Sequence, residues 1–503
     1  MKFIIRPFAE IMIKSKPVRK KYMQALQRNI RIKTRDVSEN IKISIFYDKL
    51  EVNLKDTDLM EQEKENIPAI KKILSRTPGV ESFLEVESHE ICDMDLMVEK
   101  AAEIYLDQIK DKTFCVRIKR TGKHEFTSTQ LERHIGGGLL KKLDALGING
   151  KVQMRNPEVT VSLVVKDENL YVIKSTGRGL GGYPIGMQEK VVSLLSGGFD
   201  SGVAAYSLMK RGCKVDFLFF NLGGSAHELG VKQVAYYLNN QFSAGYRANI
   251  ITVPFENVVK ELVTNTDHKY RAIILKRCML KIADILSKEN EYYAIVKGDS
   301  LGQVSSQTLK NMFAIDRAAE SLVLRPLITF NKQEIIDISK QIGTYDFACN
   351  MPEYCGVISN KPATGASLEK VLKEEARFDD SLLTQAFENK KVECVTDILN
   401  QVQNHSDDIE YKNFPTDEDI IIDIRDPQAI AKTPFSVKGR DVLQIPFFDI
   451  NNEFAKLDQT KKYLLYCDKG VMSKLHGLYL LEKGFTNIAV LQLLESDKVC
   501  GTL

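Results

Sequence analysis

The 503-residue chain lacks several features that would assign it to well-defined classes of protein. No apolar run approaches the roughly 20 residues that a membrane-spanning helix needs, and the apolar stretch at the N-terminus is too short for a signal-peptide core. These absences predict a cytosolic protein. None of the nine cysteines forms a C-x-x-C pair, which argues against a zinc site. In a reducing compartment most unpaired cysteines are small buried residues, although one or two can be catalytic.

Acidic residues are missing from one strongly basic segment. Between Lys14 and Arg35 there are nine lysine and arginine residues and no aspartate or glutamate, although the net charge of the chain is only +3. From Glu369 to Asp423 the balance reverses, with fifteen acids and six bases. A charge run is usually a solvated helix face, but this excess favours a polyanionic partner, and we expect a nucleic acid.

The length predicts three or four domains. The first part mixes strands and helices. We expect strands at 3–6, 41–46, 80–86 and 114–120, helices at 67–75 and 94–109, and a hairpin of 159–165 and 170–173. Residues 16–35 are predicted as a helix followed by a basic strand, and a second basic helix through Arg133 is predicted to break at Gly136–Gly138. Residues 176–184 are predicted to be a linker.

A glycine-rich turn lies between an apolar run at 191–195 and a helical pattern. Its sequence is Ser196-Gly197-Gly198-Phe199-Asp200-Ser201. Glycines allow backbone N–H groups to converge, and a helix N-terminus adds partial positive charge, so the pattern predicts a phosphate cradle. It is not the common G-x-x-x-x-G-K-[ST] loop, because no lysine closes it. An ordinary strand–turn–helix corner is the less favoured interpretation.

Strands and helices alternate after this turn, with further strands expected at 214–220, 249–254 and 293–297. Such alternation predicts a parallel, doubly wound sheet that binds ligands at the carboxyl ends of its strands. The loops 196–201 and 298–308 both begin at such ends. We therefore expect them to converge on one nucleotide.

The last part of the chain contains a strand at 419–423 and another at 463–466 that leads into Cys467. A loop of N–H groups followed by a helix stabilises a thiolate, which can carry a persulfide. A buried core cysteine is the alternative, but Gly470 and the charged residues of the loop favour a reactive thiol.

Four patterns resemble known families. Ser196–Ser201 resembles the loop of the ATP pyrophosphatase (PP-loop) enzymes. Val116–Arg120 together with Asn156-Pro157-Glu158-Val159 resembles the THUMP domain of RNA-modifying enzymes, and the preceding residues resemble its ferredoxin-like companion. The D-x-R strand with C-x-x-G-x-x-S at Cys467 resembles the rhodanese domain. The whole chain resembles the bacterial tRNA 4-thiouridine synthases with a C-terminal rhodanese domain, the ThiI type.

The resemblance implies a multidomain α+β and α/β fold. The expected division is a ferredoxin-like domain at 1–71, a THUMP domain at 72–176, a doubly wound PP-loop domain at 177–400, an acidic connector at 401–414 and a rhodanese-like domain at 415–503.

The implied activity is ATP-dependent sulfur transfer to tRNA, which forms 4-thiouridine at position 8. The uridine O4 is adenylated, and a cysteine persulfide then displaces AMP. The resemblance also implies a role as sulfur donor for the thiamine thiazole. The implied ligands and partners are ATP with Mg²⁺, tRNA, a cysteine desulfurase, a sulfur-carrier protein and a cellular reductant. It implies no membrane partner and no protein-only metal site, and it leaves a homodimer open.

The resemblance also assigns residues. The ATP-binding candidates are Leu194, Leu195, Ser196, Gly197, Gly198, Asp200, Ser201, Lys276, Gly298 and Gln307. Asp200 would orient Mg²⁺ or the attacking oxygen, although a turn aspartate can simply cap a helix. Lys276 could equally be a solvated helix lysine.

Cys467 is the expected persulfide carrier, and Cys355, in the loop Pro352–Val357, is its expected disulfide partner. Cys349 is a rival for that second role, and Cys500 is expected to be a tail residue. The tRNA-binding candidates are Arg117, Lys119, Arg120, Lys141 and Lys142.

Two other functions fit parts of the pattern. One is a PP-loop enzyme that adenylates its substrate for amidation. The basic THUMP-like N-terminal part and Cys467 argue against it, because such an enzyme needs neither. The other is a non-catalytic tRNA-binding sulfur carrier, against which the intact loops 196–201 and 298–308 argue.

Overall fold

The computed structural model divides into two compact units, Met1–Met187 with Lys210–Gly212, and Gln188–Met209 with Cys213–Leu503. Among the described residues, no helix is long and apolar enough to cross a membrane. The residues that the structure describes are 2–35, 37–38, 41–54, 60–91, 93–222, 224–349, 362–397, 409–416, 418–425, 430, 434–437, 440–446, 449–467, 473, 476–477, 480–481 and 483–492.

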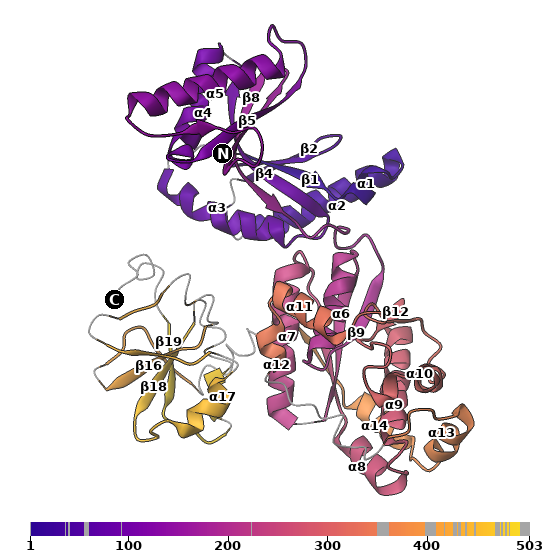
Figure 1. Ribbon diagram of the computed structural model, residues 1–503. Helices are drawn as coiled ribbons and strands as arrows, with labels where there is room; N and C mark the ends of the chain where they lie inside the picture. Colours follow the sequence, from indigo (N-terminus) through magenta and orange to yellow (C-terminus); the bar gives the residue numbers. More distant parts are fainter. Residues whose placement is uncertain are drawn as a thin grey trace. The chain divides into compact units, whose positions relative to one another are not determined.

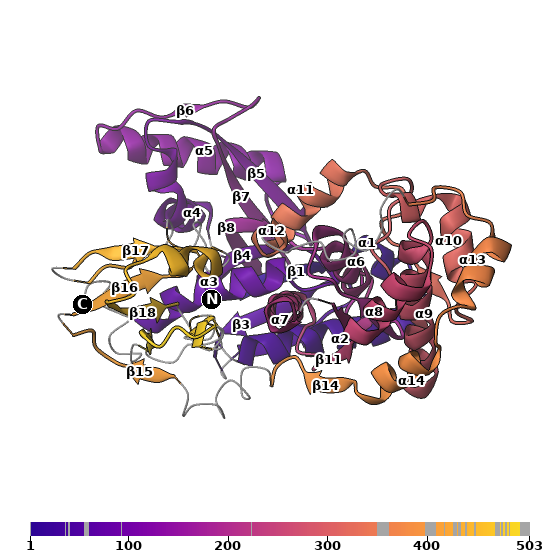
Figure 2. The same cartoon turned by 90° about the horizontal axis from the view of Figure 1, so that it is seen from below.

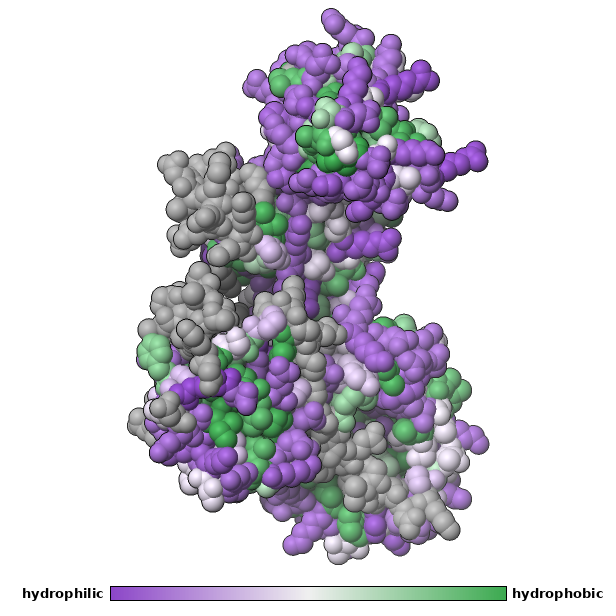
Figure 3. All heavy atoms as spheres, turned by 60° about the vertical axis from the view of Figure 1, so that its left-hand side comes forward, coloured by the Kyte–Doolittle hydropathy of each residue, from purple (hydrophilic) through white to green (hydrophobic). Residues whose placement is uncertain are grey.

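The first unit is built on one eight-stranded sheet (Figure 1). Its strands are β1 (Lys2–Pro7), β2 (Ile41–Ile45), β3 (Leu50–Leu54), β4 (Val80–Glu90), β5 (Thr113–Thr121), β6 (Lys151–Val152), β7 (Val159–Lys166) and β8 (Asn169–Arg178). Its helices are α1 (Ala9–Met12), α2 (Lys16–Arg35), α3 (Met60–Ser75), α4 (Met94–Ile109) and α5 (Ser128–Ala145). The strand order is β2-β3-β1-β4-β8-β7-β5-β6. In the view of Figure 3, the upper part of the surface, which belongs to this unit, is mostly hydrophilic.

Helix α2 corrects the expected helix followed by a basic strand, because it is one continuous helix over Lys16–Arg35. Tyr22, Leu26 and Ile30 recur at helical spacing on its buried face, and all three belong to the core. That apolar stripe decides the structure, and it leaves basic residues such as Arg28 exposed.

Two further predictions for this unit were wrong at glycines. Helix α5 continues through Gly136–Gly138, where a Cβ on Gly138 would lie 2.6 Å from Cγ1 of Val98 on α4. The missing side chain therefore allows close helix packing instead of breaking the helix. Strand β8 extends to Arg178, so residues 176–178 are not linker; a Cβ on Gly177 would collide with the ring of Phe83.

The second unit contains the predicted doubly wound sheet. Its strands are β9 (Lys190–Leu194), β10 (Lys214–Asn221), β11 (Asn249–Pro254), β12 (Ala294–Val296), β13 (Val323–Leu324) and β14 (Lys391–Cys394), in the order β13-β12-β9-β10-β11-β14. All neighbouring pairs are parallel except β11 with β14. Strand β14, which was not predicted from the sequence, pairs with β11 and forms one edge of the sheet (Figure 2).

Helices accompany this sheet and complete its α/β pattern. They are α6 (Phe199–Lys210), α7 (Gly224–Phe242), α8 (Glu256–Asn265), α9 (Arg271–Glu289), α10 (Leu309–Asp316), α11 (Lys332–Ile342), α12 (Tyr345–Cys349), α13 (Leu368–Glu375) and α14 (Ser381–Glu388). The strand order reverses between β9 and β12, since β10 and β11 extend to one side and β12 lies on the other. Ligands of such sheets bind at this point of reversal.

A second, smaller parallel sheet forms the last part of the chain. Its strands are β15 (Glu410–Lys412), β16 (Asp419–Asp423), β17 (Val442–Gln444), β18 (Lys462–Tyr466) and β19 (Ile488–Leu491), in the order β15-β19-β18-β16-β17. Short helix α17 (Ile450–Glu453) precedes a 3₁₀ turn whose Phe454 packs with Ile422 and Leu465 in the core. Cys467 directly follows β18.

Candidate functional site

Two loops meet at the carboxyl edge of the six-stranded sheet of the second unit. Strands β9 and β12 are parallel neighbours, and the loops after them begin at Leu195 and Lys297. A Cβ on Gly298 would lie 2.6 Å from the carbonyl carbon of Asp200 and 2.8 Å from the nitrogen of Ser201. The prediction that the two loops converge is therefore confirmed, and glycine at position 298 allows the contact.

The glycine-rich loop is held by its own hydrogen bonds. Gly197 has φ +82°, which favours glycine. The Ser196 backbone N–H donates to the Ser201 hydroxyl oxygen at 3.2 Å, and the Ser201 hydroxyl donates to the Gly198 carbonyl at 3.2 Å. These bonds shape the loop that leads into α6, whose N-terminus lies at the same edge of the sheet.

His227, on α7, forms a hydrogen bond with the backbone of the same loop. Its Nε2 lies 3.3 Å from the Ser196 carbonyl oxygen, and its ring meets Phe219 edge-on with centroids 4.8 Å apart. Burial lowers the pKa of His227, so the imidazole is neutral at pH 7 and donates from Nε2.

Asp200 joins three elements. Its Oδ2 accepts a hydrogen bond from Gln303 Nε2 at 2.8 Å, and its Oδ1 pairs with Lys332 Nζ at 2.8 Å. Both partners lie on other elements, so its contacts go beyond those of a helix cap. Lys332 opens helix α11, whose N-terminus is fixed by a capping box between Asn331 and Glu334. The contact of Lys332 with Asp200 was not predicted from the sequence.

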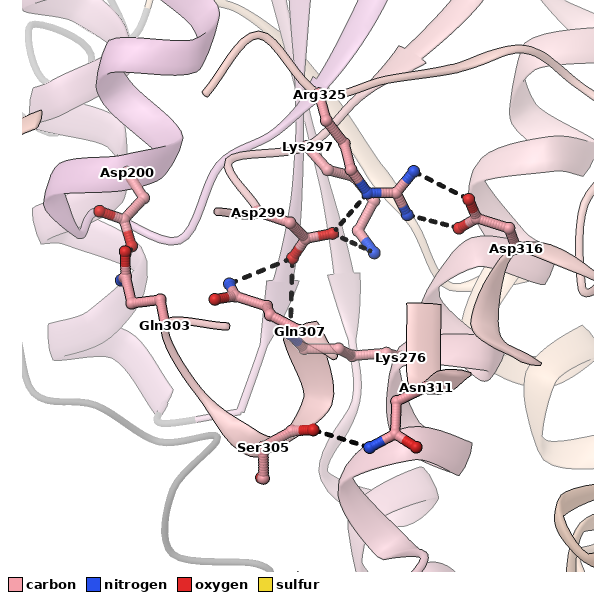
Figure 4. Close-up of polar contacts among 10 residues, drawn as sticks. All are labelled: Asp200, Lys276, Lys297, Asp299, Gln303, Ser305, Gln307, Asn311, Asp316 and Arg325. Carbon is pink, nitrogen blue, oxygen red and sulfur yellow. Dashed lines mark hydrogen bonds and ion pairs between the residues drawn. The ribbon is translucent and has the colours of Figure 1, made fainter. Parts of the chain in front are cut away.

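A buried carboxylate organises the second loop (Figure 4). Asp299 is 5% exposed. Its Oδ2 lies 2.9 Å from Lys297 Nζ and 3.1 Å from Arg325 Nε. Its Oδ1 lies 3.6 Å from Lys276 Nζ and 3.4 Å from Gln307 Nε2. The family resemblance selected Lys276 and Gln307. Lys297, Asp299 and Arg325 were missed, because their only signal in the sequence is a position within three residues of the end of a strand.

The charges of this cluster do not cancel. Burial alone would raise the pKa of Asp299, but the positive charges of Lys297, Lys276 and Arg325 outweigh burial and lower it. Burial lowers the pKa of Lys297, and Asp299 opposes that shift. Arg325 also pairs with Asp316, Nη1 to Oδ2 at 2.8 Å. Three cations against two carboxylates leave one excess positive charge, which suits a polyphosphate.

Two amide oxygens at the site lack internal partners. Gln303 Oε1 and Gln307 Oε1 are buried and accept no hydrogen bond from the described residues. Buried polar atoms are normally satisfied, so these oxygens indicate a ligand that brings donors. A nucleotide has such donors in its ribose hydroxyls and, for adenine, its amino group. Together with the glycine contacts and the excess positive charge, the residues present fit ATP. The described part of the chain holds no cluster of three His, Cys, Asp or Glu residues suited to a metal ion.

The thiol of Cys467 lies at a second site, at the end of β18. The residue is 8% exposed, its Sγ lies 3.2 Å from the Ser473 hydroxyl oxygen, and the Ser473 backbone N–H donates to Sγ at 3.4 Å. On the neighbouring strand, Arg425 pairs with Asp423, Nη2 to Oδ2 at 2.7 Å, and its guanidinium lies 5.3 Å from the Tyr466 ring centroid. The start and end of the predicted loop are thus placed together; residues 468–472 lie outside the described residues.

Several cysteine predictions fall outside what the structure describes. Cys355, the loop Pro352–Val357 and Cys500 are all outside the described residues. Cys349 is described, and it is exposed at the end of α12. The pairing of Cys355 with Cys467 therefore stays a prediction.

The tRNA-binding candidates do not share one face. Phe114, Val116 and Ile118 of β5 pack in the core with α4 and α5, so Arg117 and Lys119 lie on the opposite face of that strand. Lys141 and Lys142 lie on helix α5.

Three of these candidates also have internal contacts. Arg117 Nη2 donates to the Met154 carbonyl at 3.0 Å, Arg120 Nη1 donates to the Gly122 carbonyl at 3.2 Å, and Lys142 Nζ lies 2.7 Å from Glu99. The remaining two, Lys119 and Lys141, are exposed.

Comparison with known proteins gives a consistent pattern along the chain. Residues 2–83 match the ThiI ferredoxin-like domain, 92–173 the THUMP domain, 186–380 the family described as thiamine biosynthesis protein (ThiI), and 401–493 the rhodanese-like domain.

Individual relatives match over nearly the whole length. The tRNA sulfurtransferase of Tolumonas auensis is 44% identical over 97% of this chain and 99% of its own. That of Colwellia psychrerythraea is 42% identical over the same shares. A crystal structure of a 4-thiouridine synthetase–RNA complex with bound ATP matches with a TM-score of 0.66 and 27% identity, covering 78% of this chain and 98% of that one. PH1313 from Pyrococcus horikoshii shares the fold (TM-score 0.51, 17% identity, covering 68% and 100%). This chain belongs to the tRNA sulfurtransferase (ThiI) family.

Proposed function

We propose that the chain transfers sulfur to a uridine of tRNA in an ATP-dependent reaction that forms 4-thiouridine, at position 8. One observation carries the proposal: the same chain holds a cluster of basic side chains around Asp299 at the β9–β12 edge and a thiol with hydrogen-bond partners at the end of β18. Family membership supports the assignment, as does a similar structure that contains RNA and ATP. Neither site alone would account for sulfur transfer.

In the first step, the uridine O4 attacks the α-phosphorus of ATP. A P–O bond forms to the base, the bond to pyrophosphate breaks, and the uridine is left adenylated at O4. Leu194, Leu195, Ser196–Ser201, Lys276, Gly298 and Gln307 would surround the nucleotide. The excess positive charge around Asp299 would stabilise the charge that develops on the phosphates. Magnesium, when bound with ATP, would neutralise phosphate charge, and Asp200 is the carboxylate that would hold it.

In the second step, the outer sulfur of a Cys467 persulfide attacks C4 and AMP leaves with the former O4. The base is then joined to Cys467 through a disulfide. The thiolate of Cys355 attacks Sγ of Cys467, which releases 4-thiouridine and leaves a Cys355–Cys467 disulfide. A cellular reductant supplies the two electrons that restore both thiols. Cysteine, through a desulfurase, supplies the persulfide sulfur.

The wider assignments follow the same proposal. The division at 1–71, 72–176, 177–400, 401–414 and 415–503 separates RNA binding, adenylation, connection and sulfur carriage. We place the protein in the cytoplasm, where tRNA and reductant are present. The Cys467 persulfide would also supply sulfur to a carrier protein for the thiamine thiazole.

One assay tests the function against its rivals. The chain is incubated with bulk tRNA, labelled ATP, Mg²⁺, cysteine and a desulfurase, and pyrophosphate and thiolated base are measured. Sulfur in RNA together with pyrophosphate is the expected result. Pyrophosphate that forms without RNA would indicate an amidation-type enzyme. Bound tRNA with neither product would indicate a non-catalytic carrier.

A further inference from the structure

The two oxygens of Asp299 have different kinds of partner. Oδ2 contacts Lys297 and Arg325 at 2.9 and 3.1 Å. Oδ1 contacts Lys276 and Gln307, at the longer distances of 3.6 and 3.4 Å. Lys276 comes from α9, and Gln307 from the 3₁₀ turn η1 (Ser305–Gln307). One carboxylate therefore contacts two cations, Lys297 and Arg325, at short distances. It contacts two further side chains, Lys276 and Gln307, at longer distances, and we call these the loosely held pair (Figure 4).

The loosely held pair is the part of this cluster that can still bind a ligand. Lys276 keeps about a fifth of its side chain exposed, and Gln307 Oε1 is buried without an internal donor. Polar contacts at unliganded sites are often long and tighten when substrate binds. Arg325, in contrast, is fixed on its other side by Asp316.

We propose that Asp299 is a positioning residue for ATP: its Oδ1 aims Lys276 and Gln307 at the nucleotide, while Lys297 and Arg325 fix its Oδ2. This inference rests on the proposed function, because it takes ATP as the ligand. Asp299 acts through its neighbours and does not itself touch the nucleotide. Two carboxylate oxygens with separate partners fix the orientation of the group better than one would.

Lys297 has a separate role in the same cluster. Its Nζ is buried, and within the described part of the chain it forms an ion pair with Asp299 at 2.9 Å. It balances the buried charge of Asp299 and holds the carboxylate in place. Removing Asp299 would leave Lys297 as an uncompensated buried cation, which destabilises the fold whether or not ATP is present.

Two double-mutant cycles on the full-length chain separate positioning from stability. The first combines Asp299→Asn with Lys276→Ala and measures the ATP dissociation constant by calorimetry. Each single change should weaken ATP binding about tenfold, because each removes an interaction with a charged group. The double variant should bind ATP less than about threefold more weakly than Lys276→Ala does, because Asp299 acts largely through Lys276.

The second cycle combines Asp299→Asn with Lys297→Met and measures the unfolding temperature as well. Asp299→Asn should lower that temperature, and the double variant should recover most of the loss because no buried charge is left unpaired. Its ATP affinity should stay as weak as that of Asp299→Asn.

Asp216 provides a matched control at the opposite edge of the sheet. It is also a fully buried carboxylate, with Tyr292 donating its hydroxyl at 2.7 Å and Lys190 Nζ at 3.0 Å. Asp216→Asn should lower the unfolding temperature and leave ATP affinity unchanged.

The inference is overturned if ATP affinity recovers together with stability in the Asp299→Asn/Lys297→Met variant, or if Asp299→Asn and Lys276→Ala add independently. Failure of the proposed function would look different, because the wild-type chain would then neither bind ATP nor release pyrophosphate.

Discussion

A Cβ atom added to Gly298 would lie 2.6 Å from the carbonyl carbon of Asp200. The loops 196–201 and 298–308 therefore approach each other backbone to backbone, and one methyl group at position 298 is enough to separate them. We expect Gly298→Ala to lower tRNA-dependent pyrophosphate release at least about tenfold, because small displacements at a reacting centre are costly.

The matched control for this change is Gly137→Ala. A Cβ at Gly137 meets no atom within 4 Å, and the residue lies inside α5. Alanine is favoured over glycine in a helix by about 1 kcal/mol, so this variant should be slightly more stable and equally active. Unchanged pyrophosphate release in Gly298→Ala would show that the loop contact is not required for adenylation.

A change at Cys467 should abolish sulfur transfer and leave adenylation intact. Cys467→Ser should abolish thiolation of tRNA while tRNA-dependent pyrophosphate release continues, since serine cannot carry a persulfide. Cys394→Ser, at the edge strand β14, should leave both activities intact. Loss of pyrophosphate release in Cys467→Ser would mean that the residue is not a dedicated sulfur carrier.

Asp200→Ala should give the opposite pattern. Pyrophosphate release should disappear, because its contacts with Gln303 and Lys332 order the nucleotide site. Formation of the Cys467 persulfide, measured by transfer of labelled sulfur from cysteine and a desulfurase to the protein, should persist. If both activities vanished together in a folded variant, the two sites would not be independent.

The second thiol of the reaction can be identified by comparing two cysteines. We expect Cys355→Ser to stop turnover after about one equivalent of thiolated tRNA or fewer, since the intermediate on Cys467 has no resolving thiol. Cys349→Ser should turn over normally. The reverse pattern would assign the resolving role to Cys349, which is exposed six residues earlier.

His476 should make the rhodanese-like part sensitive to acid. Burial lowers its pKa from 6.5 to about 3. Between these values the unfolded chain binds more protons, so stability is complete above pH 6.5 and falls as the pH drops toward 3. At pH 5 the loss should be about 2 kcal/mol.

Thermal unfolding of wild type and His476→Gln between pH 7 and 5 tests this expectation. The variant should show a smaller decline in unfolding temperature with acidification. His268→Gln, in which an exposed side chain is changed, is the control and should keep the wild-type decline. An equal decline in His476→Gln and wild type would assign the acid sensitivity to other groups.

The strands of the six-stranded sheet and the loops of the proposed nucleotide site were predictable, because apolar runs and glycine turns reflect the preferences of neighbouring residues in the sequence. The prediction of a helix break at Gly136–Gly138 was wrong because it rested on local preference alone. The local cost of glycine is outweighed there by the close packing of α5 on Val98, which no local pattern reveals.

The candidate site was predictable only where residues belong to a motif. Lys276 and Gln307 were selected through resemblance, but Asp299, Lys297 and Arg325 gain their roles from contacts between segments far apart in sequence. Strand β14 was missed because its pairing with β11 joins residues about 140 positions apart.

In the proposed reaction, the oxygen lost from the uridine leaves as part of AMP. It can be tested with a tRNA transcript whose uridines carry ¹⁸O at O4, incubated with the chain, ATP, Mg²⁺, cysteine and a desulfurase. The AMP product is then analysed by mass spectrometry. Adenylation at O4 should leave one ¹⁸O atom in the phosphate of AMP for each 4-thiouridine formed. Unlabelled AMP alongside thiolated tRNA would rule out adenylation at O4.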